Sequence, residues 1–149
     1  MKKILLITCI FLLSNCGYQP LYSTKDINKF TFQEIEIFGD KNINNRIISA
    51  LSIKESNENF LYEKIVLKNN KRIVETSKDS KGTPDSFKMI ITLDVMIKNN
   101  GKAVKETSFI KDFSYKNLDN KFDLSEYEIN VKNNLIERII EELIIYLNL

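Results

Sequence analysis

The strongest hydrophobic pattern in the chain lies at residues 87–97, where every second residue is apolar. Because the side chains of a β-strand alternate between its two faces, this pattern predicts a strand with one apolar face. The segment 99–101 (Asn-Asn-Gly) then turns the chain back into another strand. A two-residue loop would pair Ile91 with Ile110 and bring polar residues to the apolar face. We predict a three-residue loop, which pairs Ile91 with Phe109 and keeps the aromatic residues on that face.

Two other segments repeat their apolar residues at helical spacing. The first starts at Asp40 or Asn42, either of which can cap a helix, and ends near Ser56. Its apolar positions are Ile43, Ile47, Ile48 and Leu51, with Asn44, Asn45 and Arg46 predicted to face outward. The second runs from about Leu124 to Leu147, and Ser125 or Asp123 can cap it. Its apolar stripe comprises Val131, Leu135, Ile136, Ile139, Ile140, Leu143, Ile144 and Leu147.

The remaining pattern supplies two more strands and a long loop. Residues 30–38 are rich in Phe and Ile, and residues 62–67 with 73–74 form a more polar strand region. Gly82 and Pro84 mark a loop over 78–86. The resulting order is β-α-β-β-β-α. It predicts an α+β fold: a two-layer sandwich with a four-stranded mixed or antiparallel sheet and two helices on one face.

Composition narrows the possible chemistry. The chain has 149 residues, 43% of them hydrophobic and 28% charged, which suits one globular domain. It contains no His, so it lacks the commonest general base and the commonest metal ligand. It also has no glycine-rich phosphate loop and no activated nucleophile. We therefore expect a protein that is not an enzyme and that uses no metal or cofactor.

The N-terminal segment has the pattern of an export signal. Lys2 and Lys3 precede a short apolar run over 4–13, which is too short to span a membrane. Once this segment is removed, 20 basic residues face 20 acidic ones, because Lys2 and Lys3 leave the total of 22. A neutral chain is not expected to bind nucleic acid.

The end of that segment resembles a bacterial lipobox. Leu13-Ser14-Asn15-Cys16-Gly17 has Leu three residues before the Cys, a small residue two before it, and Gly after it. Only a thiol can form the thioether to diacylglycerol, so Cys16 is the predicted lipidation site. The alternative is a simple secretory signal with a Cys at its cleavage site. Cys9 is a weaker candidate, because apolar residues continue past it.

This prediction divides the chain into three parts: a signal peptide at 1–15, a lipidated tether at 16–28 and a single α+β domain at 29–149. Acyl chains on Cys16 would anchor the mature protein stably, since each buried CH₂ contributes roughly 0.8 kcal/mol. Gly17, in place of Asp, favours the outer membrane in lipoprotein sorting.

Several stretches of the chain together resemble LPS-assembly lipoproteins of the LptE type, especially their α-proteobacterial members. The most specific stretch is Cys16-Gly17-Tyr18-Gln19-Pro20-Leu21-Tyr22. The segment 44–51, the aromatic ending Phe113-Ser114-Tyr115, the acidic start Ser125-Glu126-Tyr127-Glu128 and the terminal Ile/Leu/Glu helix fit the same pattern.

The resemblance implies a lipoprotein that binds and plugs the LPS-assembly β-barrel, LptD. Such a protein helps to assemble the barrel and to deliver lipopolysaccharide to the cell surface. The implied partners are an LptD-like barrel, lipopolysaccharide and the membrane that holds the lipid anchor, on the periplasmic side of the outer membrane or inside the barrel lumen.

Lipopolysaccharide phosphates favour Lys and Arg that lie close together. The best local cluster of basic residues lies across the second strand region and the following loop, and comprises Lys64, Lys68, Lys71, Arg72, Lys78 and Lys81. From it we predict a lipopolysaccharide-binding site at Lys71, Arg72, Lys78 and Lys81, against the alternative of a solvated or barrel-facing strand.

Two other functions stay open at this point. One is a different outer-membrane lipoprotein adaptor, such as a secretion pilotin, which would not bind an LPS-assembly barrel. The other is a periplasmic enzyme or ligand-binding protein, which would need a deep pocket with convergent polar groups.

Overall fold

A computed structural model describes residues 30–148 of the chain. The predicted signal peptide, Cys16 and the tether lie outside these residues. The described elements are β1 (Thr31–Phe38), α2 (Lys41–Ala50), β2 (Lys54–Glu55), β3 (Tyr62–Lys78), β4 (Pro84–Asn99), β5 (Lys102–Lys116) and α3 (Lys121–Asn148).

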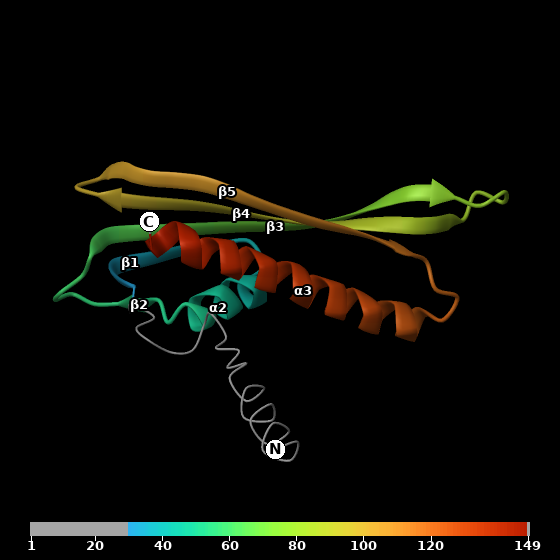
Figure 1. Ribbon diagram of the computed structural model, residues 1–149, viewed down its shortest axis with the longest axis horizontal. Helices are drawn as coiled ribbons and strands as arrows, with labels where there is room; N and C mark the ends of the chain where they lie inside the picture. The colour runs from blue at the N-terminus through green and yellow to red at the C-terminus, as the bar shows by residue number, and fades with distance from the viewer. Residues whose placement is uncertain (1–29, 149) are drawn as a thin grey trace, which may run out of the picture.

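The fold is α+β, with one mixed sheet and both helices on the same face of it (Figure 1). The sheet has five strands in the order β2-β1-β3-β4-β5. β1 pairs parallel with β2 and β3, whereas β3, β4 and β5 pair antiparallel. The two-layer α+β prediction is thus confirmed, but the predicted count of four strands is wrong by one.

The missed strand is β2, and it also explains why the first helix is shorter than predicted. Asp40 caps α2 as predicted, accepting hydrogen bonds from the backbone of Asn42 and Ile43. The helix ends at Ala50, not near Ser56, because Ser52 adopts a positive φ of 50° and breaks the helical path. The chain then runs beside β1, where the N–H of Lys54 donates to the carbonyl of Phe30 at 3.0 Å.

The alternating residues of β4 form the centre of the core, as their pattern predicts. Met89, Ile91, Leu93, Val95 and Ile97 are all buried. They pack against the predicted stripe of α3, whose Val131, Leu135, Ile136, Ile139, Ile140 and Leu143 are also buried. α3 starts three residues earlier than predicted, at Lys121, because the Asn120 side chain accepts from the N–H of Phe122.

The turn between β4 and β5 differs from the prediction, but the faces do not. Asn99 pairs with Lys102 across a two-residue turn, in which Asn100 and Gly101 have φ of 50° and 71°. A bulge at Val104 then shifts the pairing, so that Phe109 lies opposite Leu93 and not opposite Ile91. The bulge restores the side-chain alternation that the tight turn alone would reverse. The three-residue loop was therefore wrong, while the buried face of β5 was correct.

Two buried asparagines join β1, α2 and β3. Asn69 Nδ2 donates to the carbonyl of Asp40 at 2.9 Å, and its Oδ1 accepts from the N–H of Asp40 at 3.1 Å. Asn44 Nδ2 donates to the carbonyl of Phe38 at 3.0 Å, so Asn44 faces the core and not outward as predicted. Gly39 passes so close to β3 that an added Cβ would lie 2.1 Å from the carbonyl oxygen of Asn69.

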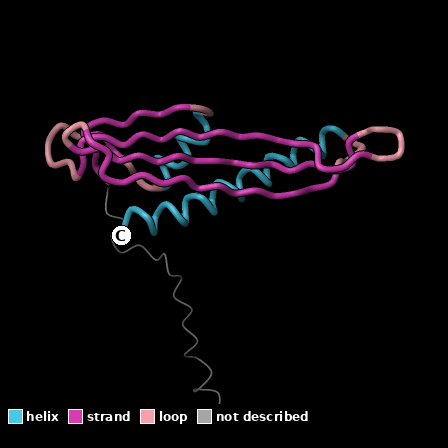
Figure 2. The backbone as a smooth tube through the Cα atoms, turned by 90° about the horizontal axis from the view of Figure 1, so that it is seen from above, coloured by secondary structure: helices cyan, strands magenta, loops and turns pink. Residues whose placement is uncertain are grey.

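Figure 2 shows how α3 lies on the sheet. The helix crosses the strands diagonally, and its C-terminal end lies beyond the edge strand opposite β1. That edge strand is β5, on which Phe109 packs against Tyr146 with ring centroids 5.9 Å apart. Because of this crossing, the two ends of β5 have different surroundings.

Candidate binding surfaces

The four residues predicted to bind lipopolysaccharide lie toward the end of the β3–β4 hairpin but do not form one cluster. Lys71 pairs in register with Ile91, which faces the helices, whereas Arg72 pairs with Ile90 and so faces the outer side of the sheet. Lys78 forms an ion pair with Glu75 at 3.3 Å. Lys81 lies in the turn after β3, where its N–H donates to Asp79 Oδ1 at 2.8 Å.

The structure instead brings Arg72 close to Lys88 on the outer face. Lys88 pairs in register with Val74, which lies two residues from Arg72 on the same face of β3. Lys88 Nζ is 3.8 Å from Asp112 Oδ2, while no ion pair of Arg72 is found among the described residues. This pair could not be predicted from the sequence, because it depends on the register of β3 against β4. The alternation within each strand was the one available signal.

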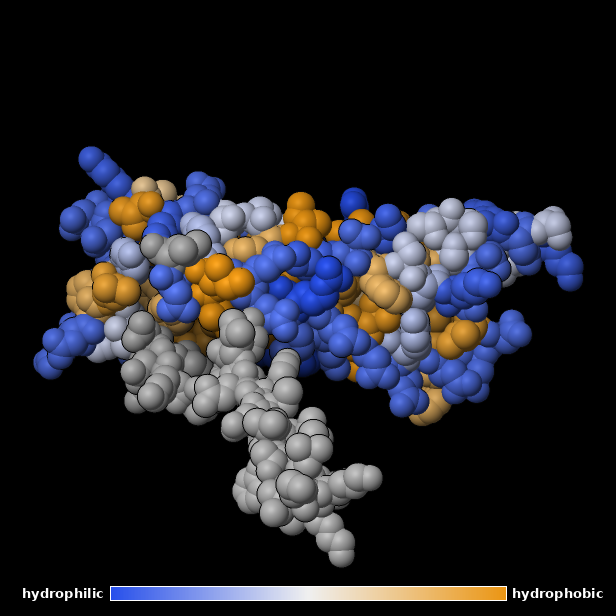
Figure 3. All heavy atoms as spheres, in the orientation of Figure 1, coloured by the Kyte–Doolittle hydropathy of each residue, from blue (hydrophilic) through white to orange (hydrophobic). Residues whose placement is uncertain are grey.

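A hollow of about 430 Å³ lies between β5 and the middle of α3. Its apolar lining comprises Phe113 of β5 with Tyr127, Val131 and Leu135 of α3. Polar and charged residues border it: Asn130, Asn134, Glu137, Arg138 and Glu141. Figure 3 views the molecule from the side of this hollow, and apolar atoms gather between the sheet and the helix, to the right of centre.

Next to the hollow, Tyr115 holds α3 against β5. Its hydroxyl donates to Glu128 Oε1 at 2.7 Å, and its ring contacts Tyr127 with centroids 5.9 Å apart. Burial of the hydroxyl, reinforced by the Glu128 carboxylate, raises the pKa of Tyr115 well above its usual value. The raised pKa keeps the phenol protonated, and thus a hydrogen-bond donor, to a higher pH than that of an ordinary tyrosine.

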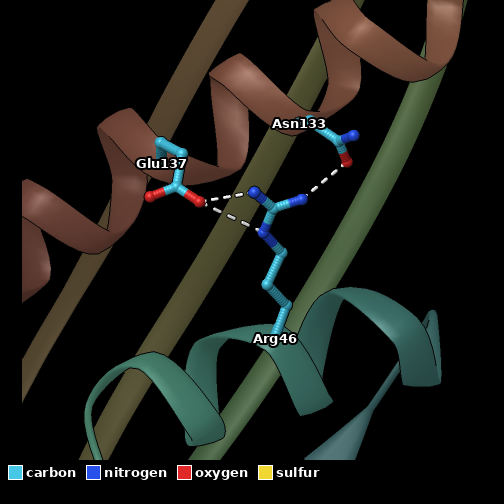
Figure 4. Close-up of polar contacts among 3 residues, drawn as sticks. All are labelled: Arg46, Asn133 and Glu137. Carbon is cyan, nitrogen blue, oxygen red and sulfur yellow. Dashed lines mark hydrogen bonds and ion pairs between the residues drawn. The ribbon is translucent and has the colours of Figure 1, made fainter.

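On the other flank of α3, Arg46 of α2 contacts both Glu137 and Asn133 (Figure 4). Its Nε is 3.2 Å from Glu137 Oε1, and its NH1 donates to Asn133 Oδ1 at 2.7 Å. The two charged side chains are 38% and 52% exposed, so solvent screens the pair and it contributes about 1 kcal/mol at most. We interpret these contacts as a link between α2 and α3. They use the hydrogen-bonding groups of the Arg46 guanidinium.

Within residues 30–148 no three acidic, Cys or His side chains converge on a point that could hold a metal ion. No helix in this range is long and apolar enough to cross a membrane.

Comparison with known proteins relates the chain to others by structure alone. No protein-family model and no curated protein matches the sequence. A minor lipoprotein from Acinetobacter baumannii superposes with a TM-score of 0.54 at 14% identity, over 78% of this chain and 88% of that one. Lipoprotein B from Nitrosomonas europaea superposes with a TM-score of 0.53 at 11% identity, over 81% and 87% of the two chains. The chain therefore shares the fold of two bacterial lipoproteins.

Proposed function

We propose that the protein is an outer-membrane lipoprotein of the LptE type. It is anchored by acyl chains on Cys16, and it binds and plugs an LptD-like barrel that carries lipopolysaccharide to the surface. One observation carries the proposal: a lipobox-like segment at 13–17 precedes a domain with the fold of bacterial lipoproteins.

The outer face of the sheet suits a polar barrel lumen. Charged and hydroxyl side chains recur along this face and form ion pairs and hydrogen bonds with one another. Lys64 lies 3.0 Å from Glu34 and 2.9 Å from Glu36, and the Ser108 hydroxyl donates to Asp94 at 2.7 Å. Such a face can contact the polar side chains of a barrel lumen. The anchor raises its effective concentration at the barrel.

Co-purification tests the partner. The full chain with a C-terminal tag is extracted from outer membranes in detergent, and its companions and N-terminal peptide are identified by mass spectrometry. We expect an LPS-assembly barrel in equimolar amount and an acylated Cys16 as the first residue. A secretin, or no barrel at all, would contradict the proposal. In the Cys16→Ser control, barrel recovery should fall sharply while the domain stays folded.

Lipopolysaccharide binding belongs to the same proposal, and the two faces of β3 allow a matched test. Replacing Lys71, Arg72, Lys78 and Lys81 together by Glu should weaken binding of purified lipopolysaccharide at least tenfold. Arg72→Glu and Lys71→Glu then separate the outer face from the helix face with the same change of charge. We expect the larger loss from Arg72→Glu, because Lys88 lies beside it. Unchanged affinity in the fourfold variant would remove these residues from the site.

A further inference from the structure

One end of the domain combines the start of the described chain with the loop before β3 and the β4–β5 turn. Phe30 is the first described residue. In the loop before β3, the N–H of Leu61 donates to the carbonyl of the next residue along, Thr31, at 3.0 Å. The turn lies at the same end, because the N–H of Gly101 donates to Glu63 Oε2 at 3.0 Å. We call this end, at the left of Figure 1, the tether end.

The tether end exposes large apolar side chains. Phe60 and Leu61 of the loop before β3 are 40% and 63% exposed, and Val104 near the start of β5 is 50% exposed. Apolar atoms are accordingly visible at the left of Figure 3. The turn between β3 and β4, at the far end of the domain, is instead Asp-Ser-Lys-Gly-Thr at 79–83. Apolar side chains that gather on an exposed surface indicate a contact with another protein or a membrane.

The charges around this apolar surface balance. Within two residues of the loop 56–61 and of the turn 99–102 lie Lys54, Lys98 and Lys102, together with Glu55, Glu58 and Glu63. A surface with balanced charge gains little from an anionic partner. Removal of apolar surface from water is the main attraction that this end offers.

The position of Phe30 decides which end of the domain lies near a lipid anchor. Cys16 lies 14 residues before Phe30, which allows a separation of at most about 50 Å at roughly 3.6 Å per residue. β3 is 17 residues long and spans about 56 Å at roughly 3.3 Å per residue. The tether end can therefore meet the bilayer easily. The far end could face the bilayer only if the 14 residues were almost fully extended.

We propose that the tether end rests on the phospholipid surface, with Leu61 and Val104 at the headgroup level and the β3–β4 turn directed away from the bilayer. This inference rests on the acylated Cys16 of the proposed function but not on a barrel. Interfacial apolar side chains enter the bilayer by about 5 to 10 Å. The neighbouring lysines can keep their charged groups in water at that depth. The contact orients the domain on the membrane before any protein partner binds.

Single tryptophans test the orientation, because the chain contains no Trp. Leu61→Trp, Val104→Trp and Lys81→Trp are made in the full chain. Each acylated protein is placed in vesicles of phosphatidylcholine that include brominated phosphatidylcholine, which quenches tryptophan fluorescence on contact. We expect quenching at least about threefold stronger at positions 61 and 104 than at 81, because only the first two lie at interfacial depth.

Phe122→Trp is the matched control for apolar exposure. Phe122 is 74% exposed but lies at the start of α3, at the far end of the domain (Figure 1). Its quenching should be as weak as that at position 81. Equal quenching at 61 and 81, or quenching at 122 as strong as at 61, would overturn the proposed orientation.

Mass spectrometry of the N-terminal peptide separates this inference from the proposed function. A chain without acyl groups on Cys16 would overturn the anchor, and this inference with it. An acylated chain with equal quenching at both ends would overturn the orientation alone and leave the anchor in place.

A charge variant tests the contact itself. In the Val104→Trp background, Leu61→Glu should reduce quenching at least about twofold, because burial of a carboxylate opposes the approach of the tether end to the bilayer. Leu118→Glu, the same change at an exposed position of the far end, is the matched control and should leave the quenching unchanged. Circular dichroism checks that each variant is folded. Equal quenching in the two charge variants would overturn the proposal.

Discussion

The two halves of β3 belong to one continuous strand but differ in burial. In the first half Ile65, Leu67 and Asn69 are buried under the helices, whereas in the second half Lys71, Ile73 and Glu75 continue the same face and are exposed. The helices cover only the first half, so the second half is supported by pairing with β4. Alternation thus sets which way a side chain points, but the neighbouring layer decides whether it is buried.

The largest expected effect is a loss of stability on truncating a buried isoleucine in the first half of β3. The same truncation of an exposed isoleucine in the second half should have little effect. Ile65→Ala removes a fully buried side chain and should lower the free energy of unfolding by between about 2 and 5 kcal/mol. Ile73→Ala, at 37% exposed, should cost less than about 1 kcal/mol. Urea denaturation of both variants measures the difference. Equal losses would mean that the second half of β3 is covered in solution.

A glycine pair extends the comparison to the backbone. Gly39→Ala, beside the buried first half of β3, should destabilise the folded protein by about 3 kcal/mol. The reason is that φ is 92° and the added Cβ meets the carbonyl of Asn69. Gly82→Ala, in the turn after β3, has a φ of 82° with open space around it and should cost only about 1 kcal/mol. Thermal unfolding of the two variants gives the ranking, and a reversed order would contradict the close approach at Gly39.

Neighbouring asparagines on opposite faces of β3 give a smaller effect. Asn69→Ala should cost about 2 kcal/mol, since the half-buried N–H of Asp40 loses its acceptor and the carbonyl of Asp40 keeps only the N–H of Asn44 as a donor. Asn70→Ala, on the exposed face, should change stability by less than about 0.5 kcal/mol. Chemical denaturation at neutral pH compares them. A similar effect of both substitutions would argue against the buried network.

The smallest effect concerns Tyr115 and depends on pH. At pH 8, Tyr115→Phe should cost about 1 kcal/mol through loss of the hydrogen bond to Glu128. Because folding raises the pKa of this phenol, the folded state keeps its proton while the unfolded chain loses it above about pH 10. Wild-type stability should therefore fall as the pH rises above 10, and more steeply than that of the variant. Urea denaturation of both proteins at about pH 8 and about pH 11 gives the loss of unfolding free energy between the two pH values. An equal loss in the wild type and the variant would contradict the raised pKa.

The chain's local patterns were sufficient for much of the fold. The alternation at 87–97, the stripe of α3 and the Asp40 cap depend on the periods of single elements and on contacts within a few residues. The face of β5 followed from the same alternation, although its turn did not. The proposed lipidation of Cys16 rests on the same kind of local signal, a short run of residues read in order.

What the sequence left undecided involves residues far apart along it. β2, the burial of Asn44, the opposite faces of Lys71 and Arg72, and the hollow beside Phe113 each depend on strand order, register or the diagonal path of α3. The period of a strand or helix repeats within that element. The free energy that selects one strand neighbour, one bulge or one crossing direction comes from packing between elements, and only the assembled tertiary structure determines it.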